Sequence, residues 1–273
     1  MSYERLIAYF DILGFKNLVL SETLESMVGR FGQIYTTIGA AAVRHEAEQQ
    51  DILSVGAIAE RYEQIEAADL GGIRAAFEEA TGMTLLLMSD SLVMYSHPLV
   101  HDRDDWFRQL STLLRVSRTV IDKLLEYELP ARGALGFGEL YVDAANGIYV
   151  GKGLVEVYEL AESQEWIGVV AAPSLTNDLS EMHKGFTMER WRQGKWLARA
   201  DWDYLPYDVP FKTGPQRMYA VNWATTPNAR HLQGSNLFRR GLAEPPQVAV
   251  KSTNTLAFLN QASRDGFQGI ASR

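Results

Sequence analysis

Two aspartates stand where apolar segments end, in positions from which carboxylates can hold a metal ion. Asp11 closes the apolar run LIAYF and is followed by Gly14, while Asp90 lies in the tripeptide SDS between two further apolar runs. Two carboxylates that meet in a pocket repel each other, so they either share a proton or bind a cation. Oxygen ligands favour Mg²⁺ or Mn²⁺, and such ions keep coordination positions open for phosphate oxygens. The pattern therefore suggests phosphate chemistry, provided that the fold brings both acids together.

The order of elements predicts that the acids do meet. Apolar spacing of three and four predicts long helices, and short apolar or β-branched runs predict strands. The expected elements are a strand at 6–10, a helix at 21–42, a hairpin at 83–96 with SDS at its tip, a helix at 104–128, a strand at 131–143, a short strand or turn at 146–153, a helix at 154–165 and a strand at 166–175. This β-α-ββ-α-β-α-β order indicates a ferredoxin-like α+β core, an antiparallel sheet with helices on one side, extended by a C-terminal hairpin region.

Domain boundaries follow from composition. Residues 1–225 are interpreted as one catalytic domain, in which the charged, alanine-rich segment 43–80 is a helical insertion with Gly71 and Gly72 as a break. Residues 226–273 are interpreted as a C-terminal tail with a short helix. Three glycines in RGALGFG predict a strand that another element approaches closely.

Composition excludes several classes of protein. The formal net charge of −8 argues against a non-specific nucleic-acid binder, although a local basic pocket is invisible in that sum. The absence of cysteine excludes disulfides and thiolate chemistry. No signal-like N-terminus and no apolar run of about 20 residues occur, so we expect a cytoplasmic protein that binds no membrane.

Simpler interpretations of the same residues stay open. Asp11 can cap the helix that follows it, and Asp90 can be an ordinary hairpin-tip residue. Arg132, in the glycine-rich strand, can pair with an acid in the core, and Lys212 can be a solvated turn lysine.

Taken together, these residues resemble the class III nucleotidyl cyclases. That family carries F-x-D-I-x-G-F-T on its first strand, where this chain has FDILGFK at 10–16, and a second metal-binding Asp in its hairpin, where this chain has Asp90. The family's R-x-G-x-x-x-G resembles RGALGFG at 132–138, and its late V-K-G-x-x-x-x-Y resembles FKTGPQRMY at 211–219. The resemblance covers about residues 4 to 223 as an order of motifs.

The resemblance implies a homodimer with composite sites at the subunit interface. Each site would hold two Mg²⁺ or Mn²⁺ ions and convert a nucleoside triphosphate to the 3′,5′-cyclic monophosphate and pyrophosphate. The implied residues are Asp11, Asp90 and the Ile12 carbonyl for the metals, Gly14, Phe15, Lys16, Arg132 and the partner-contributed Lys212 for phosphate, and Leu86 and Ile148 beside the base. For Lys16, opening the helix is an equal alternative to contacting phosphate.

Two departures from the family refine the expectation. Purine-specific members read the base with polar side chains at the places occupied here by Leu86 and Ile148, which core packing also explains. Without those hydrogen bonds a purine is not selected. With DILGFK at 11–16 and SDS at 89–91, the chain looks more like the divergent bacterial pyrimidine cyclases of Pycsar anti-phage defence, which also lack the purine-reading pair. This resemblance implies UTP before CTP as substrate and a cyclic-nucleotide effector as downstream partner.

The second departure concerns the late helix. The family places there an Asn and, four residues later, an Arg that stabilises the transition state, whereas this chain has Val155 and Glu159. Lys152, Lys212 and Arg190 are the cations available as substitutes. The alternative is a catalytically degenerate, cyclase-like domain that binds nucleotide or serves as an interaction module.

Overall fold

A computed structural model describes residues 3–49, 70–98, 103–182, 184, 203–232 and 246–271 of the chain. Its elements in chain order are β1 (Glu4–Ile12), α1 (Phe15–Ser21), α2 (Leu24–Gln49), α4 (Leu70–Thr81), β2 (Met83–Met88), β3 (Ser91–Ser96), α5 (Arg103–Glu126), β4 (Ala131–Glu139), β5 (Tyr141–Asp143), β6 (Ile148–Val150), α6 (Lys152–Glu162), β7 (Gly168–Ala171), the 3-10 turn η1 (Pro173–Leu175), β8 (Tyr204–Phe211), β9 (Gly214–Val221), α8 (Pro227–Leu232) and α10 (Pro246–Ala271).

One mixed sheet organises the described part of the chain. Its seven strands run in the order β2-β3-β1-β4-β7-β9-β8. Every neighbouring pair is antiparallel except β4 and β7. Strands β5 and β6 form a separate antiparallel pair. The predicted α+β class with a largely antiparallel sheet is confirmed, and the C-terminal hairpin β8–β9 extends that sheet beyond β7.

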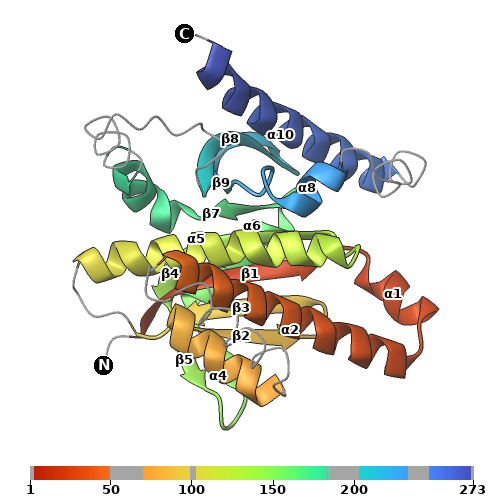
Figure 1. Ribbon diagram of the computed structural model, residues 1–273, viewed down its shortest axis with the longest axis vertical. Helices are drawn as coiled ribbons and strands as arrows, with labels where there is room; N and C mark the ends of the chain where they lie inside the picture. Colours follow the sequence, from red (N-terminus) through yellow and green to blue (C-terminus); the bar gives the residue numbers. More distant parts are fainter. Residues whose placement is uncertain are drawn as a thin grey trace.

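Helices cover both faces of the sheet, so the expected placement of the helices on one side is wrong for α6. Helices α2, α4 and α5 lie in front of the sheet in Figure 1, and α6 lies behind it. Two successive residues of β4 show this, because neighbouring side chains of a strand point to opposite faces. Phe137 makes an edge contact with Trp106 of α5, with ring centroids 4.7 Å apart. A Cβ atom on Gly136 would lie 2.7 Å from Val157 of α6.

Glycines let α6 lie directly on the backbone of β4. A Cβ atom on Gly138 would lie 3.0 Å from the Cα of Gly153, and one on Gly153 would lie 2.7 Å from the side chain of Ile7. The close approach expected from RGALGFG is therefore present, and the element that approaches is α6.

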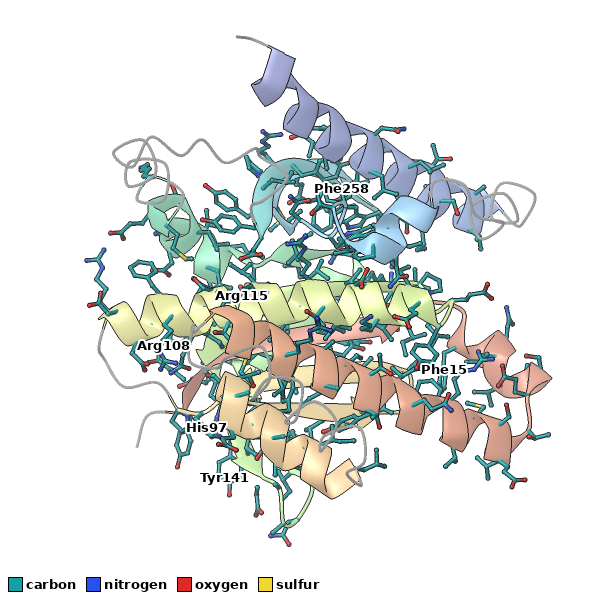
Figure 2. All side chains as sticks on the ribbon, viewed as in Figure 1. Phe15, His97, Arg108, Arg115, Tyr141 and Phe258 are labelled. Carbon is teal, nitrogen blue, oxygen red and sulfur yellow. The ribbon has the colours of Figure 1, made fainter. Side chains whose placement is uncertain are left out.

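The C-terminal helix closes the far end of the core. Phe258 of α10 is fully buried, and its ring packs against Trp166, Tyr207 and Trp223 at centroid distances of 4.9, 5.0 and 5.6 Å. Figure 2 shows Phe258 between α10 and the β8–β9 layer. The tail thus holds a helix of 26 residues instead of the short one expected, and that helix is anchored in the core.

The segment 43–80 is only partly described. Helix α2 continues to Gln49 and α4 begins at Leu70, so the expected insertion is helical at both ends, and residues 50–69 lie outside the described residues. The expected break at Gly71 and Gly72 is wrong, because both lie in the first turn of α4, where glycine weakens a helix less than in its middle. Among the described residues, no helix is both long enough and apolar enough to cross a bilayer.

Candidate active site

The carboxyl end of β1 brings the two aspartates together. In the sheet register Asp11 lies opposite Ser91 of β3 on one side and Arg132 of β4 on the other. The next residue, Ile12, donates its backbone N–H to the Asp90 carbonyl at 2.9 Å. Asp90 occupies the tight two-residue turn between β2 and β3, in which Ser89 has φ 56°. The predicted convergence of Asp11 with the hairpin tip is therefore present in the backbone.

Tyr9 and Ser91 lie beside the two acids. The hydroxyls of Tyr9 and Ser91 are 2.7 Å apart and buried. Burial raises the pKa of Tyr9, and the negative charges of Asp11 and Asp90 raise it further. Both carboxylates thus act on the same hydroxyl. Sequence analysis missed this tyrosine, although its position two residues before Asp11 puts it on the same face of the strand.

Arg132 is held by two acids at once. Its Nε donates to Asp11 Oδ2 at 2.8 Å, and its Nη2 donates to a carboxylate oxygen of Glu162 at the end of α6. Its Nη1 donates to the carbonyls of Glu162 and Gln164 at 2.9 and 3.3 Å. The Arg132 side chain is 9% exposed and that of Asp11 14%. In the structure this arginine fixes the Asp11 carboxylate, as in the core-pair alternative, and its contact with phosphate stays a prediction.

The charge state of Asp11 reflects opposing influences. Burial raises the pKa of Asp11, the hydrogen bond and positive charge of Arg132 lower it, and the neighbouring carboxylate of Glu162 raises it again. Glu162 gave no signal in the sequence, because its nearness to Asp11 depends on the packing of α6. A carboxylate has two oxygens and several lone pairs, so Asp11 can accept from Arg132 and still ligate a cation.

The donor set fits a hard divalent cation held by few protein groups. Within the ranges that the structure describes, no three acidic or histidine side chains lie close enough together to form a metal cage. A metal ion would have Asp11, Asp90 and backbone oxygen as protein ligands, with the other positions left to water or substrate. Mg²⁺ is commonly bound in this way, through one or two carboxylates and phosphate oxygens.

The start of α1 lies next to this pair. Gly14 adopts the left-handed conformation, with φ 79°, and α1 begins at Phe15. The first backbone N–H groups of a helix have no intrahelical partner. Phe15 packs against Phe31 of α2, and Lys16 is exposed. The positions of Gly14, Phe15 and Lys16 are compatible with a phosphate contact, and their role stays a prediction.

Lys212 lies in the turn between β8 and β9, next to the chain segment that holds Arg132. Its side chain is exposed, and its backbone N–H donates to the Ser163 carbonyl at 2.9 Å. Phe211 and Gln164 form a β-bridge beside it. The turn is thus anchored one residue from the contacts that Glu162 and Gln164 make with Arg132.

The remaining predicted residues lie on outward or partly covered surfaces. Leu86 is half-buried against the core, whereas Ile148 of β6 is 44% exposed, so the expected core packing is wrong for Ile148. Val155, which is 54% exposed, and Glu159 lie on the outer face of α6. Lys152 is exposed at the start of α6. Arg190 lies outside the described residues.

Comparison with known proteins gives structural likeness alone. No protein-family model matches this chain, and no curated protein matches it. The catalytic core of a rhodopsin-guanylyl cyclase with converted specificity, in complex with ATPαS, is 10% identical, covers 81% of this chain and 96% of its own, and has a TM-score of 0.44. The adenylyl cyclase CyaB from P. aeruginosa is 10% identical, with 80% and 93% covered and a TM-score of 0.41.

A third structure is the guanylate cyclase domain of RhGC from Catenaria anguillulae in complex with GTP. It is 10% identical and covers 81% of this chain and 97% of its own, with a TM-score of 0.41. With TM-scores below 0.5, these likenesses carry no weight in assigning a function to this chain.

Proposed function

We propose that the protein is a nucleotidyl cyclase that forms a 3′,5′-cyclic nucleotide from a nucleoside triphosphate at the Asp11 end of the sheet. The observation that carries the proposal is the meeting of Asp11 with the Asp90 turn, through the hydrogen bond of 2.9 Å from Ile12 to the Asp90 carbonyl. The order of the surrounding motifs, which resembles that of class III cyclases, supports it.

In this proposal Asp11, Asp90, Arg132 and Lys212 each have a defined role. Asp11 and Asp90 would hold two Mg²⁺ or Mn²⁺ ions, which would lower the pKa of the ribose 3′-hydroxyl, so that its proton passes to water, and would stabilise the leaving pyrophosphate. The 3′-oxygen then bonds to the α-phosphorus as the bond to pyrophosphate breaks. Arg132 keeps the Asp11 carboxylate in one orientation through the contact of 2.8 Å. Lys212, contributed by the second copy of a homodimer, supplies positive charge near the phosphates.

A pyrimidine triphosphate is the proposed substrate, UTP before CTP. Leu86 and Ile148 have no polar atoms with which to read a purine edge, and a site selects a base by polar groups that only the right base satisfies. The biological role that follows from the resemblance is second-messenger synthesis in anti-phage defence, with a separate effector that binds the cyclic nucleotide.

A composite site in a homodimer would explain why apolar side chains are exposed on the outward face of α6. Val155 and Tyr158 are 54% and 47% exposed on this helix, directly over the sheet face that carries Asp11. These two side chains lie at the surface on which we propose that a second copy binds. A second copy there would bring its own Lys212 or Lys152 towards the phosphates.

The test is product formation by the purified protein. Each of ATP, GTP, CTP and UTP is incubated with it in Mn²⁺, and cyclic products are identified by mass spectrometry. We expect one cyclic pyrimidine nucleotide from the wild type and none from Asp90→Asn. Asp104→Asn, in the first turn of α5 and away from the Asp11 end of the sheet, is the matched control and should retain activity. Absence of any cyclic product from the wild type would contradict the proposal.

A second candidate function is nucleotide binding without turnover. The observation in its favour is that Val155 and Glu159 stand where the family has its transition-state Asn and Arg. In that case UTP or CTP stabilises the protein against unfolding in the presence of Mn²⁺, Asp90→Asn removes the stabilisation, and no pyrophosphate is released.

A further inference from the structure

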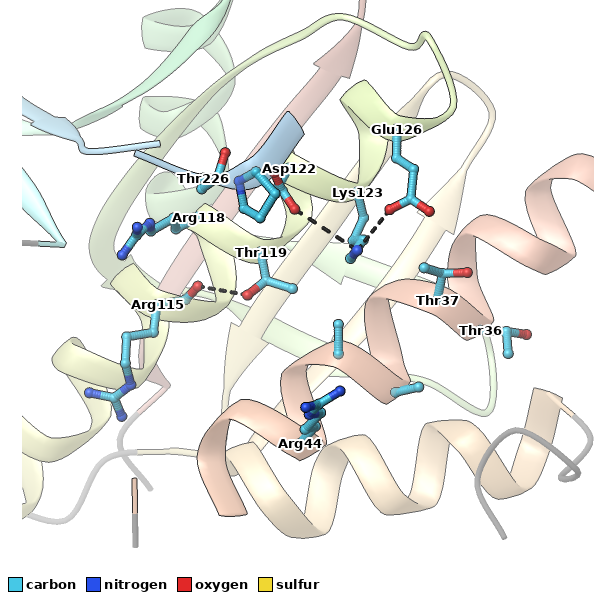
Figure 3. Close-up of a pocket in the computed structure, with 13 residues that line it drawn as sticks. Thr36, Thr37, Arg44, Arg115, Arg118, Thr119, Asp122, Lys123, Glu126 and Thr226 are labelled. Atoms are coloured by element: carbon cyan, nitrogen blue, oxygen red, sulfur yellow. Dashed lines mark hydrogen bonds and ion pairs between the residues drawn. The ribbon is translucent and has the colours of Figure 1, made fainter. Parts of the chain in front are cut away.

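A cavity lies on the opposite side of the sheet from Asp11. It has a volume of about 650 Å³ and is formed between α2 and α5, with the start of α8 at one edge. Figure 3 shows the side chains that line it. The candidate active site faces α6, whereas α2 and α5 cover the other face, so the two sites are separated by the sheet.

The cavity results from a mismatch in side-chain size along two helices. Helix α2 contributes small side chains to it, Thr36, Thr37, Ala40 and Ala41, which cannot fill the space opposite the long side chains of α5. At one end the helices are joined by a hydrogen bond of 2.9 Å between the hydroxyls of Thr37 and Tyr127. The space between the two helices therefore follows from the small size of these α2 side chains.

The lining is basic in an acidic protein. Arg44 of α2 lines it together with Arg115, Arg118, Lys123, Asp122 and Glu126 of α5, whereas the whole chain has a formal net charge of −8. The described lining thus has two more basic than acidic side chains. Arg118 also pairs with Asp203 at 3.6 Å. A negative net charge disfavours the binding of large polyanions, but it does not prevent a small anion from binding at one local basic site.

Both acids of the lining have partners at one side of the cavity. Asp122 accepts hydrogen bonds from the backbone and side-chain nitrogens of Asn228 at 3.0 and 3.1 Å. Glu126 accepts from the ammonium group of Lys123 at 2.7 Å. These contacts hold the negative charges at the α8 side and at the end of α5.

The basic side chains that line the cavity come from two helices. Arg44 comes from α2 and Arg115 from α5, as Figure 3 shows. Arg115 donates from one Nη to the hydroxyl of Thr112 at 3.0 Å. A guanidinium group has five N–H donors, so it can bind a further acceptor while keeping such a contact. A tetrahedral phosphate presents several oxygens in different directions and can accept from both walls, which a planar carboxylate cannot do as well.

We propose that this cavity between α2 and α5 binds a small phosphorylated molecule, with Arg44 and Arg115 contacting its phosphate. A volume of about 650 Å³ is larger than one phosphate group needs, so the ligand carries an organic part that lies along Thr36, Ala40 and Thr119. The site does not depend on the proposed cyclase activity, because none of its residues belongs to the candidate active site.

The test uses inorganic pyrophosphate as the probe, with the full chain in a chelator to exclude metal-dependent binding. Its dissociation constant is measured by calorimetry, and stabilisation is measured as the shift in Tm. We expect saturable binding to the wild type at millimolar concentration or below. Arg44→Gln and Arg115→Gln should each weaken it about tenfold or more, because each removes charge-assisted hydrogen bonds.

Two matched variants distinguish binding in this cavity from binding elsewhere on the protein. Arg217→Gln removes an exposed arginine that pairs with Asp208 on the β8–β9 hairpin, and it should leave the affinity unchanged. Asp90→Asn should also leave it unchanged. The proposal is overturned by absence of binding to the wild type, by equal binding to Arg44→Gln and Arg115→Gln, or by loss of binding in Asp90→Asn alone. If Arg115→Gln does not fold, Arg44→Gln, at an exposed position, decides the question.

Discussion

Replacing Arg132 by Met should reveal how strongly the Asp11 carboxylate depends on this arginine. The substitution keeps an unbranched side chain of similar length but removes the charge and four hydrogen bonds. Breaking a buried ion pair by removing one partner typically costs about 3–5 kcal/mol, because the other charge stays buried. With Arg132 9% and Asp11 14% exposed, we expect a loss of about 3 kcal/mol near neutral pH.

The loss should depend on pH. Burial already raises the pKa of Asp11, and without the opposing charge of Arg132 this pKa rises further. The folded variant therefore binds the proton more tightly than the unfolded chain, so its stability is greatest in acid and falls as the pH rises through the pKa of Asp11 in the folded protein. The difference in unfolding free energy between wild type and variant should be smaller at about pH 5 than at about pH 8.

The assay is urea unfolding followed by tryptophan fluorescence at both pH values, with the double variant Arg132→Met/Asp11→Asn as control. The double variant should recover about 2 kcal/mol of the loss, because no unpaired carboxylate remains between the strands. A loss below about 1 kcal/mol in the single variant, or no recovery in the double variant, would refute the view that Arg132 serves chiefly to hold Asp11.

Three further predictions test other parts of the structure. Gly151→Ala should destabilise the protein by about 1–3 kcal/mol in urea unfolding, because its Cβ atom would lie 2.0 Å from a carbonyl oxygen of β4, whereas Gly29→Ala, with nothing within 4 Å, should be neutral or stabilising. Equal stability of the two variants would contradict this packing. Lys212→Ala should raise the KM for the triphosphate about tenfold with folding unchanged, and mixing it with Asp90→Asn should restore activity, since one composite site is then intact. No restoration in the mixture would exclude a lysine supplied by the partner. Burial raises the pKa of Tyr204 in the folded protein. The contribution of this group to the free energy of unfolding is therefore fully present below the ordinary tyrosine pKa of about 10 and is lost as the pH rises above it. Tyr204→Phe should therefore reduce the fall in the urea midpoint above about pH 10, and an unchanged fall would contradict it.

The fold was predictable from the sequence where its signals are local. Helix periodicity predicted α2 and α5, and the two apolar runs around SDS predicted the β2–β3 hairpin, because spacing along one element determines which face is buried. The C-terminal segment was misjudged, since α10 is stabilised by the packing of Phe258 against aromatic residues far away in the sequence. A single sequence does not reveal such contacts.

The candidate site was predictable only in part for the same reason. Asp11 lies near the end of β1 and Asp90 directly before the neighbouring strand β3, so strand order alone places them together. Glu162 enters because α6 crosses the far face of β4, which no spacing in the sequence indicates. The expectation that Ile148 is a core residue was wrong because β6 belongs to the small separate pair with β5, outside the main sheet.

The close packing of α6 on glycines has a consequence for how such a protein can diverge. The inner positions of this helix, such as Gly153, contact backbone or fully buried side chains and accept almost no substitution. The outer positions, such as Val155 and Glu159, are exposed and carry none of that packing. Mutation can therefore change the side chains that α6 exposes while the packing beneath them is preserved, so the surface over the candidate site can diverge faster than the fold.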